Sequence, residues 1–304
     1  MVKKFMITGS NGILGSEFIK YFKENSIDFS ILDYKDILDL AHEDLIKIIS
    51  GVDILIHCAA NTNVEWCEKN EDLCNLHNVV LTNKLSKICK VNSIKLIFIS
   101  STGVYGDHKA MPYSETDLLE PTTVHHLSKK LAENSVILIS KNNLILRVGW
   151  LFGGEFKNKK NFVARRLEEM LSASLRKTTL YSDIEQKGCP SWTYDVVKGA
   201  IILIQKNKSG VFNVCNSGCA SRFDYVYEIS KIARGYGLDG VNIKGVGSAF
   251  FSRIANVSRN ETANNSKLNI EALHTMPPWQ ESLRKYLSEM DIISELEKYE
   301  ESII

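Results

Sequence analysis

Three glycines near the start of the chain have the spacing of a phosphate-binding loop. Gly9, Gly12 and Gly15 are three residues apart. They follow the apolar run Phe5–Thr8 directly and precede a segment with helical spacing. At such a junction the first glycine permits a tight turn, the second lets backbone N–H groups approach a pyrophosphate, and the third allows close helix–strand packing. We therefore interpret the segment as a dinucleotide-binding loop rather than a structural turn.

An acidic residue stands where such a fold binds the ribose of its cofactor. Asp33 follows the second apolar run, about 20 residues after Gly12. A carboxylate there accepts a hydrogen bond from the ribose 2′-OH and repels a 2′-phosphate, which favours NAD(H) over NADP(H). A solvated loop acid, in company with Asp36 and Asp39, stays open as the alternative.

Apolar runs of strand length alternate with helical patterns through the first half of the chain. Five runs are predicted to be parallel strands buried on both faces: Phe5–Thr8, Phe29–Leu32, Ile54–His57, Leu96–Ser100 and Leu144–Val148. Helical spacing is found between them in Leu14–Asn25, Glu43–Ser50, Leu73–Val91 and Ser128–Ser140. Repeated β-α units imply right-handed crossovers, so the predicted fold class is α/β, with a Rossmann-type doubly wound parallel sheet.

The second half is less regular and predicts a smaller C-terminal substrate-binding lobe. The expected elements are helices over Phe162–Ala173, Tyr194–Lys206 and Tyr225–Tyr236, a strand over Val211–Cys215, and a final acidic helix over Trp279–Glu301. We assign residues 1–152 to the dinucleotide-binding domain, completed by about 184–220. Residues 153–183 and 221–304 then form the lobe, which we place over the C-terminal edge of the sheet, where open α/β sheets bind ligands.

The totals of the sequence argue against several classes of protein. The 37 basic and 36 acidic residues leave a net charge of +1, so we expect neither a nucleic-acid nor a membrane partner. The seven cysteines are scattered without a C-x-x-C pair, which favours reduced thiols in a cytoplasmic protein. The basic runs Lys157–Lys160 and Arg165–Arg166 are interpreted as solvated faces, with a role near a phosphate as the open alternative.

Several segments, taken in order, resemble one family. Thr8–Gly15, Ile56–Ala60 and Ser100–Gly106 resemble the extended short-chain dehydrogenases that act on nucleotide sugars. Further segments are similar to dTDP-4-dehydrorhamnose reductases: Ala59–Glu65, Pro112–Asp117, Arg147–Trp150, Gln186–Pro190 with Thr193 and Asp195, and Lys267-Leu268 followed by Pro278-Trp279. The resemblance covers nearly the whole chain.

This resemblance implies a chemistry and a set of catalytic residues. The reaction is a hydride transfer from a nicotinamide cofactor to the C4 ketone of a nucleotide-linked 4-keto-6-deoxyhexose, in deoxysugar or surface-polysaccharide synthesis. A serine or threonine orients the carbonyl, a tyrosine protonates its oxygen, and a lysine lowers the tyrosine pKa and binds the nicotinamide ribose. The serine position is Ser101 and the lysine position is Lys129.

The tyrosine position holds His125, four residues before Lys129. The flanking residues fit without a gap, so the family tyrosine is absent. As the leading hypothesis, His125 is the proton donor of an enzyme, although a nearby Lys129 depresses the pKa of a histidine. A second hypothesis gives the role to another group: His126, Tyr105, Tyr113, or a water relayed through Ser101 or Thr102.

Two further readings of the whole chain stay open. It could be a non-catalytic regulatory subunit that binds a dinucleotide or a nucleotide sugar. With less weight, it could be a nucleotide-sugar epimerase or dehydratase, whose cofactor is oxidised and regenerated within one turnover.

The remaining site residues follow from the loop and from the resemblance. We expect cofactor contacts from Gly9, Asn11, Gly12, Ile13, Leu14, Gly15, Asp33, Asp39, Leu40, Cys58, Ala59, Ala60 and Lys129. The resemblance implies substrate contacts from Val64, Thr102, Trp150, Asn161 and Arg259, with Arg222 as an alternative partner for the diphosphate. Asn78 is interpreted as a structural brace, and core packing is the alternative for Trp150. No group has metal-ligand spacing, so we expect no metal; a homodimer is compatible with the resemblance.

Overall fold

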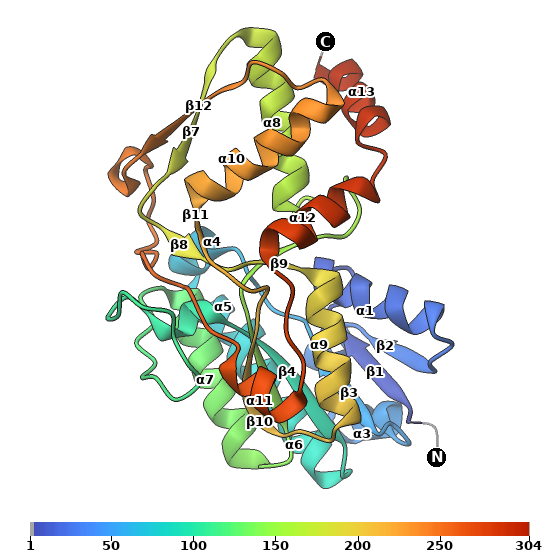
Figure 1. Cartoon of the computed structure of the whole chain (residues 1–304). Helices are drawn as coiled ribbons and strands as arrows, with labels where there is room; N and C mark the ends of the chain where they lie inside the picture. Colours follow the sequence, from blue (N-terminus) through green and yellow to red (C-terminus); the bar gives the residue numbers. More distant parts are fainter. Residues whose placement is uncertain (1–2, 304) are drawn as a thin grey trace.

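A six-stranded parallel sheet forms the centre of the larger lobe. The structure is a computed structural model that describes residues 3–303. The strand order in the sheet is β10-β5-β4-β3-β1-β2, and every neighbouring pair is parallel (Figure 1). The strands are β1 (Phe5–Thr8), β2 (Phe29–Leu32), β3 (Ile54–His57), β4 (Lys95–Ser101), β5 (Leu144–Val148) and β10 (Gly210–Val214). The predicted fold class and the position of all five predicted strands are confirmed.

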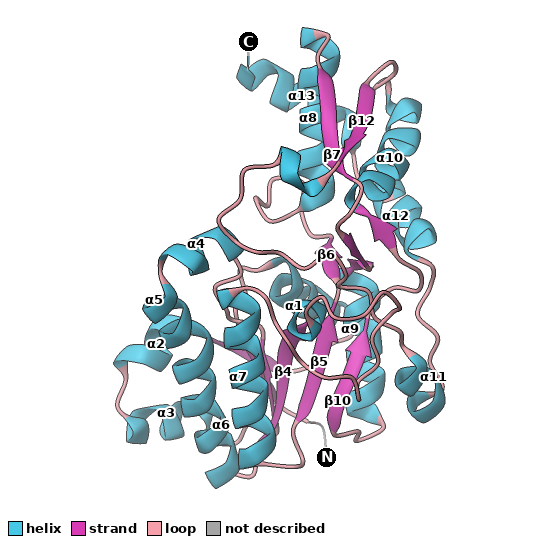
Figure 2. Ribbon diagram, turned by 90° about the vertical axis from the view of Figure 1, so that its left-hand side faces the viewer, coloured by secondary structure: helices cyan, strands magenta, loops and turns pink. Residues whose placement is uncertain are grey.

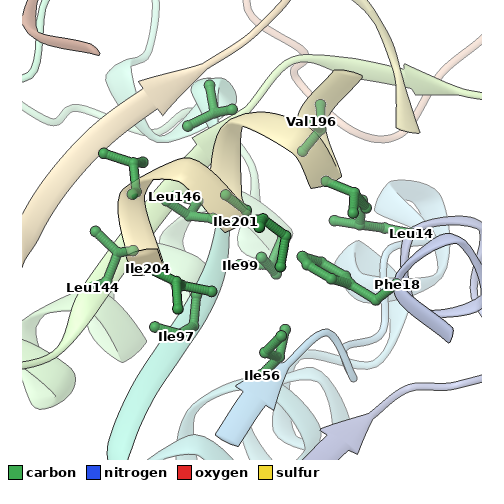
Figure 3. Packing of buried hydrophobic residues seen from close by; sticks show 14 of the residues in the cluster. Leu14, Phe18, Ile56, Ile97, Ile99, Leu144, Leu146, Val196, Ile201 and Ile204 are labelled. Atoms are coloured by element: carbon green, nitrogen blue, oxygen red, sulfur yellow. The ribbon is translucent and has the colours of Figure 1, made fainter. Parts of the chain in front are cut away.

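Successive strand residues serve two different helical layers, because side chains alternate across a strand. Ile97 and Ile99 of β4 pack with α1 (Ile13–Glu24) and α9 (Thr193–Gln205), in the cluster shown in Figure 3. Leu96 and Phe98 of the same strand point to the other face. That face is covered by α2 (Tyr34–Asp39), α3 (His42–Ile49), α6 (Leu81–Val91) and α7 (Val124–Ile139).

One predicted strand is less buried than expected. The apolar run Phe29–Leu32 predicts a strand buried on both faces, but β2 is the edge strand. Ile31 is accordingly 52% exposed. An edge position cannot be seen in a run of four residues, since it depends on the order of strands in space.

Two predicted helices have different bounds, and both changes affect the site. The expected helix Leu73–Val91 is built from α5 (Glu71–Asn75), a π-helical turn η1 (Leu76–Val80) and α6, after a short α4 (Val64–Lys69). The expected helix Ser128–Ser140 begins earlier, at Val124, because the Thr123 hydroxyl accepts the backbone N–H of His126 as an N-cap. His125 and Lys129 therefore lie on the same helix.

The smaller lobe lies beyond the carboxyl ends of the sheet strands. In Figure 2 the arrows of β4, β5 and β10 point toward it. Its helices are α8 (Phe162–Arg176), α10 (Arg222–Ala233), α12 (Trp279–Ser288) and α13 (Ile292–Ile303), which share one apolar core. The parallel pair β7 (Thr179–Asp183) and β12 (Asn242–Val246) flanks them. The expected single helix over Trp279–Glu301 is thus two helices.

Part of the C-terminal segment returns to the sheet domain. Helix α11 (Ser266–Ala272) places Leu268 and Ala272 in the same core as α1 and α9. This differs from the expected continuous lobe over residues 221–304. Two short pairs connect the lobes: β6 (Trp150–Phe152) with β9 (Pro190–Trp192), and β8 (Lys187–Gly188) with β11 (Ala220–Ser221).

Candidate active site

A cavity of about 480 Å³ opens at the carboxyl ends of the strands, beside the glycine loop. Eight of the expected cofactor contacts line it: Gly9, Gly12, Ile13, Leu14, Gly15, Cys58, Ala60 and Lys129. The glycine loop shapes this end of the cavity, because a Cβ on Gly9 would be 2.6 Å from the backbone nitrogen of Ala59. A Cβ on Gly15 would be 2.2 Å from the carbonyl oxygen of Gly9. Only glycine fits either position, which leaves the loop backbone open to a ligand.

The other expected cofactor residues lie outside this cavity. Asn11 and Asp39 are exposed, Leu40 is half-buried, and Ala59 donates its backbone N–H to the hydroxyl of Thr8. The exposed carboxylate of Asp33 accepts the backbone N–H of Lys35 at 3.1 Å. Asp33 comes directly after β2, in the row of strand ends that includes β1 and β3.

The three expected catalytic residues come together in the same cavity. Ser101 ends β4, and its hydroxyl accepts the backbone N–H of Gly103 at 3.2 Å. His125 and Lys129 are one turn apart on α7, and all three side chains line the cavity with the glycine loop. The sheet supplies Ser101 and the helix supplies the other two, so the packing of α7 on β4 sets their relative positions.

The surroundings of His125 favour the neutral form of its imidazole. It is buried, and burial lowers its pKa well below the usual value; His126 and Lys129 lower it further. Its Nδ1 atom is buried without a hydrogen-bond partner in the described part of the chain. This environment disfavours the histidinium acid that was considered from the sequence. The residue can still donate one N–H as a neutral imidazole.

Lys129 is the second titratable group of the trio. Burial lowers its pKa to about 8, and the Glu133 carboxylate opposes that shift. Glu133 itself is tied to Arg147 by a buried ion pair at 2.7 Å. The Lys129 ammonium lies 4.2 Å from the ring centroid of Phe98, which stabilises the charged form through a cation–π contact. An ammonium with this pKa is mostly protonated near neutral pH and can release a proton.

The alternative proton donors do not line this cavity. The Nδ1 atom of His126 lies 3.0 Å from the Thr123 hydroxyl, and its ring lies over Gly103. Tyr105 is fully buried and donates its hydroxyl to Asn213 at 2.7 Å. The expected alternatives His126, Tyr105, Tyr113 and Thr102 are all buried away from the cavity. This geometry gives no support to direct donation by His126, Tyr105 or Tyr113, and the hypothesis of a water relayed through Ser101 or Thr102 stays a prediction.

A second cavity, of about 310 Å³, lies under the smaller lobe and is rich in arginine. The guanidinium carbon of Arg222 lies over the indole of Trp150, 3.4 Å from the ring centroid. Burial lowers the pKa of Arg222 to about 10. Arg166 and Arg253 line the same cavity, and the Nε atom of Arg166 is buried without a partner among the described residues. Such a site can bind a desolvated anion through guanidinium forks.

Comparison with known proteins agrees with this architecture. The model of the family "RmlD substrate binding domain" matches residues 3–292. The chain belongs to this family. A spore coat polysaccharide biosynthesis protein, SpsK, from Bacillus subtilis is 28% identical over 295 residues, which cover 94% of this chain and 97% of the relative. A dTDP-4-dehydrorhamnose reductase from Mycobacterium tuberculosis is 27% identical over 293 residues, covering 94% and 93%.

Solved RmlD-family structures share the fold. A dTDP-4-dehydrorhamnose reductase from Clostridium acetobutylicum superposes with a TM-score of 0.85 at 25% identity, over 94% of this chain and 98% of the other. A dTDP-4-dehydrorhamnose reductase from Bacillus anthracis, solved in complex with NADP, has a TM-score of 0.85 at 25% identity, over 95% and 100%.

Within this RmlD-family chain, the expected substrate residues lie in different environments. Val64 lines the second cavity. Trp150 is buried beneath Arg222 and donates its indole N–H to Glu261 at 2.7 Å, so it supports the cavity from below. Thr102 is buried outside both cavities.

Two of the substrate expectations gain no support from the geometry. Asn161 is fully buried: its side chain caps α8 by accepting the Ala164 N–H and donates to the Tyr286 hydroxyl. No polar atom of its amide is left for a ligand. Arg259 is exposed and lines neither cavity, whereas the alternative Arg222 does. The signal that could have favoured Arg222 is its place in a capping sequence at the start of an amphipathic helix.

The expected brace Asn78 holds the backbone near the catalytic residues. Its amide N–H groups reach the carbonyl oxygen of Asn61 at 3.0 Å and the hydroxyl of Ser128 at 2.9 Å. Ser128 in turn donates to the carbonyl oxygen of His125 at 2.6 Å. Asn78 lies in the π-helical turn η1, whose extra residue re-aims the side chains of this helix. Neighbouring strands and helices thus fix the start of α7.

Among residues 3–303, no group of three or more His, Cys, Asp or Glu side chains is arranged to hold a metal ion. Within the same range, no helix is both long and apolar enough to cross a membrane.

Proposed function

We propose that this protein reduces the 4-keto group of a nucleotide-linked 4-keto-6-deoxyhexose with NAD(P)H, in deoxysugar or surface-polysaccharide synthesis. The observation that carries the proposal is that Ser101, His125 and Lys129 line one cavity with the glycine loop Gly9–Gly15. The relatives named as dTDP-4-dehydrorhamnose reductases and as a dTDP-4-keto-6-deoxy-D-glucose reductase from Streptomyces niveus support the substrate class.

The residues of the larger cavity fit a nicotinamide dinucleotide. The backbone of Gly9–Gly15 would hold its diphosphate at the start of α1, and Cys58 and Ala60 would lie beside it. When bound, the reduced nicotinamide supplies the hydride. Because the Bacillus anthracis relative was solved with NADP, a preference of this chain for NAD(H) rests on Asp33 alone.

The three catalytic side chains divide the work on the ketone. Ser101 orients the carbonyl through its hydroxyl, and the neutral imidazole of His125 donates a hydrogen bond to the carbonyl oxygen. As the carbonyl carbon gains hydride, its oxygen becomes an alkoxide and takes a proton from the Lys129 ammonium, which becomes a neutral amine. Each group stabilises charge that develops in the transition state. A neutral imidazole can act as such an electrophile when its pKa is lowered.

The second cavity supplies the substrate-binding part of the proposal. Arg222, Arg166 and Arg253 would hold the diphosphate of the nucleotide sugar. Glu169 and Asp183 neutralise part of their charge: Glu169 pairs with Arg166, and Asp183 lies 3.9 Å from Arg253. Arg222 has no carboxylate within ion-pair distance among the described residues, and its Nε donates to the side-chain oxygen of Gln186 at 3.3 Å, so its charge is not neutralised by a direct ion pair.

The proposal is tested by mixing purified protein with NADH or NADPH and dTDP-4-keto-6-deoxyglucose, and following the absorbance of the reduced nicotinamide. We expect oxidation of one cofactor for each ketone reduced. Cofactor binding without turnover of any 4-keto nucleotide sugar would contradict the proposal and favour the regulatory subunit. Tightly held NAD that copurifies and is regenerated in each turnover would favour the epimerase or dehydratase.

The surroundings and assembly of the protein remain predictions. All seven cysteines are free thiols, which supports the predicted location of the protein in the reducing cytoplasm. Leu127 and Leu131 of α7 and Val80 of η1 are exposed apolar side chains, which supports a homodimer. Sedimentation analysis of wild type and of Leu131→Glu checks that state, because a charge in a self-interface favours the monomer.

A further inference from the structure

We infer that Lys159, Lys160 and Arg165 bind the cofactor diphosphate together with the glycine loop; this rests on the proposed function. The two lysines belong to the strap, residues Gly153–Lys160, which connects β6 to α8. Arg165 lies in the first turn of α8. All three side chains line the same cavity as Gly9, Gly12 and Gly15. The strap and the loop come from opposite ends of the sequence and meet only in the folded protein.

The strap is held in place at both of its ends. Gly154 lies against Ile13 of the glycine loop, and its carbonyl oxygen accepts the Tyr286 hydroxyl at 3.0 Å. Its backbone has φ +74°, which suits glycine. At the other end the Lys160 ammonium donates to the hydroxyl of Thr62 at 3.2 Å. The strap therefore reaches from the start of α1 to the loop after β3, beside the cavity.

The charged lining of the cavity is entirely cationic. Among the described residues that line it, the ionic side chains are Lys129, Lys159, Lys160 and Arg165, and none is a carboxylate. A cleft lined by one sign of charge concentrates ligands of the opposite sign. The diphosphate of a dinucleotide carries two negative charges. Without these basic side chains, only backbone N–H groups would face it. Lys159, Lys160 and Arg165 are exposed and also line this cavity, which supports the alternative of a role near a phosphate.

The consecutive arginines at the start of α8 are divided between the two cavities. Arg165 lines the cofactor cavity, whereas Arg166 lines the second cavity and pairs with Glu169. Successive residues of a helix point about 100° apart, so one turn can serve two anions. This division assigns Arg165 and the strap lysines to the cofactor rather than to the nucleotide sugar.

The strap also contains its own control residue. Lys157 pairs with Glu155 at 3.1 Å, is 83% exposed at its side chain, and does not line the cavity. It has the same charge and lies in the same loop as the two inferred ligands. If the charge of the strap affected cofactor affinity only in a general way, removing the charge of Lys157 would also weaken binding. If Lys159 and Lys160 contact the cofactor specifically, removing the charge of Lys157 would leave binding unchanged.

The experiment measures the Kd of NADH and NADPH, from the fluorescence of the bound reduced nicotinamide, for four proteins. These are wild type, the double variant Lys159→Gln/Lys160→Gln, Arg165→Gln and the control Lys157→Gln. We expect the double variant to raise both Kd values about tenfold, since each exposed ion pair contributes about twofold to fivefold. Arg165→Gln should raise them about threefold, and Lys157→Gln should leave them unchanged. Added salt should narrow these differences, because it screens exposed charges.

Three results would overturn the inference while leaving the proposed function intact. Unchanged Kd values in the double variant would exclude the contact. A loss confined to NADPH would place the lysines at a 2′-phosphate instead of the diphosphate. Weaker binding of dTDP, measured by calorimetry, with unchanged NADH binding would assign the strap to the nucleotide sugar. If wild type bound neither cofactor, the proposed function would fail first, and this inference with it.

Discussion

The imidazole of His126 lies directly over Gly103, so close that a Cβ on Gly103 would be 2.1 Å from its Cε1 atom. His126 directly follows His125 in α7, and Gly103 lies in the 3-10 turn η2 (Thr102–Tyr105), which follows Ser101. Ser101 and His125 are two of the proposed catalytic residues. The Thr123 hydroxyl holds the ring from the other side. This contact sets the distance between the end of β4 and the start of α7, and hence the distance between the catalytic groups.

We predict that Gly103→Ala destabilises the protein by about 1–3 kcal/mol, the usual effect of overpacking a filled core. Chemical denaturation measures the change in the free energy of unfolding. Gly235→Ala is the matched control, because a Cβ there meets no atom within 4 Å. Combining Gly103→Ala with His126→Ala should recover part of the loss, since the clash disappears with the ring. Equal effects of Ala at Gly103 and Gly235 would contradict the contact.

The pH dependence of the reaction should report Lys129 rather than His125. Burial lowers the pKa of Lys129 to about 8. The protonated form is the active one, so kcat/KM should be constant in the neutral range and fall as pH rises through the pKa. The pKa of His125 is already well below its usual value, so no loss is expected between mildly acid and neutral pH. A loss of activity as pH rises through about 6.5 would instead indicate that a histidinium is the acid.

Arg222 should dominate binding of the nucleotide sugar. We predict that Arg222→Gln raises the Kd of dTDP by at least tenfold, because a buried charge-assisted contact is worth about 1.5–3 kcal/mol. Calorimetry measures the affinity, and NADH binding should be unchanged. Arg259→Gln is the matched control, since Arg259 is exposed outside both cavities. An equal loss in both variants would reject the second cavity as the diphosphate site.

Asp33 sets the predicted choice of cofactor. Its carboxylate should accept the ribose 2′-OH of NADH and repel the 2′-phosphate of NADPH. We expect Asp33→Ser to lower the Kd of NADPH and to raise that of NADH, each by a few-fold. Asp36→Ser is the control, because Asp36 follows Asp33 by three residues, in α2. Tighter NADPH than NADH binding in wild type would show that Asp33 lies away from the ribose.

A structural feature is best predicted from the sequence when contacts within one short segment determine it. The glycine loop is such a case, because Gly9 and Gly15 are required by contacts within a strand–turn–helix unit. The five strands were also predictable, because each buried run is apolar at successive positions. The resemblance to the family places its tyrosine position at His125, four residues before Lys129, and this assignment stays a prediction.

The rest depends on contacts between distant segments. The lowered pKa of His125 follows from its burial on α7, which packs on β4 and η1, and no local pattern records this burial. Arg222 lines the second cavity and Arg259 does not. The fold of the smaller lobe, which places Arg222 on Trp150, determines this difference. The strap lysines reach the cofactor cavity because Gly154 packs on Ile13, far away in the sequence. The helix around Asn78 contains a π-helical turn, which the helical periodicity of the sequence does not predict.

The most direct test of the account is the turnover number of His125 variants with NAD(P)H and dTDP-4-keto-6-deoxyglucose. We predict that His125→Phe binds both ligands as wild type does but lowers kcat by at least about 100-fold, because a hydrogen bond to the developing alkoxide is lost. His125→Tyr, which restores the family residue beside Lys129, should be at least as active as wild type. Full activity of His125→Phe would contradict a catalytic role for the histidine. An inactive wild type together with an active His125→Tyr would show instead that the natural chain only binds its ligands.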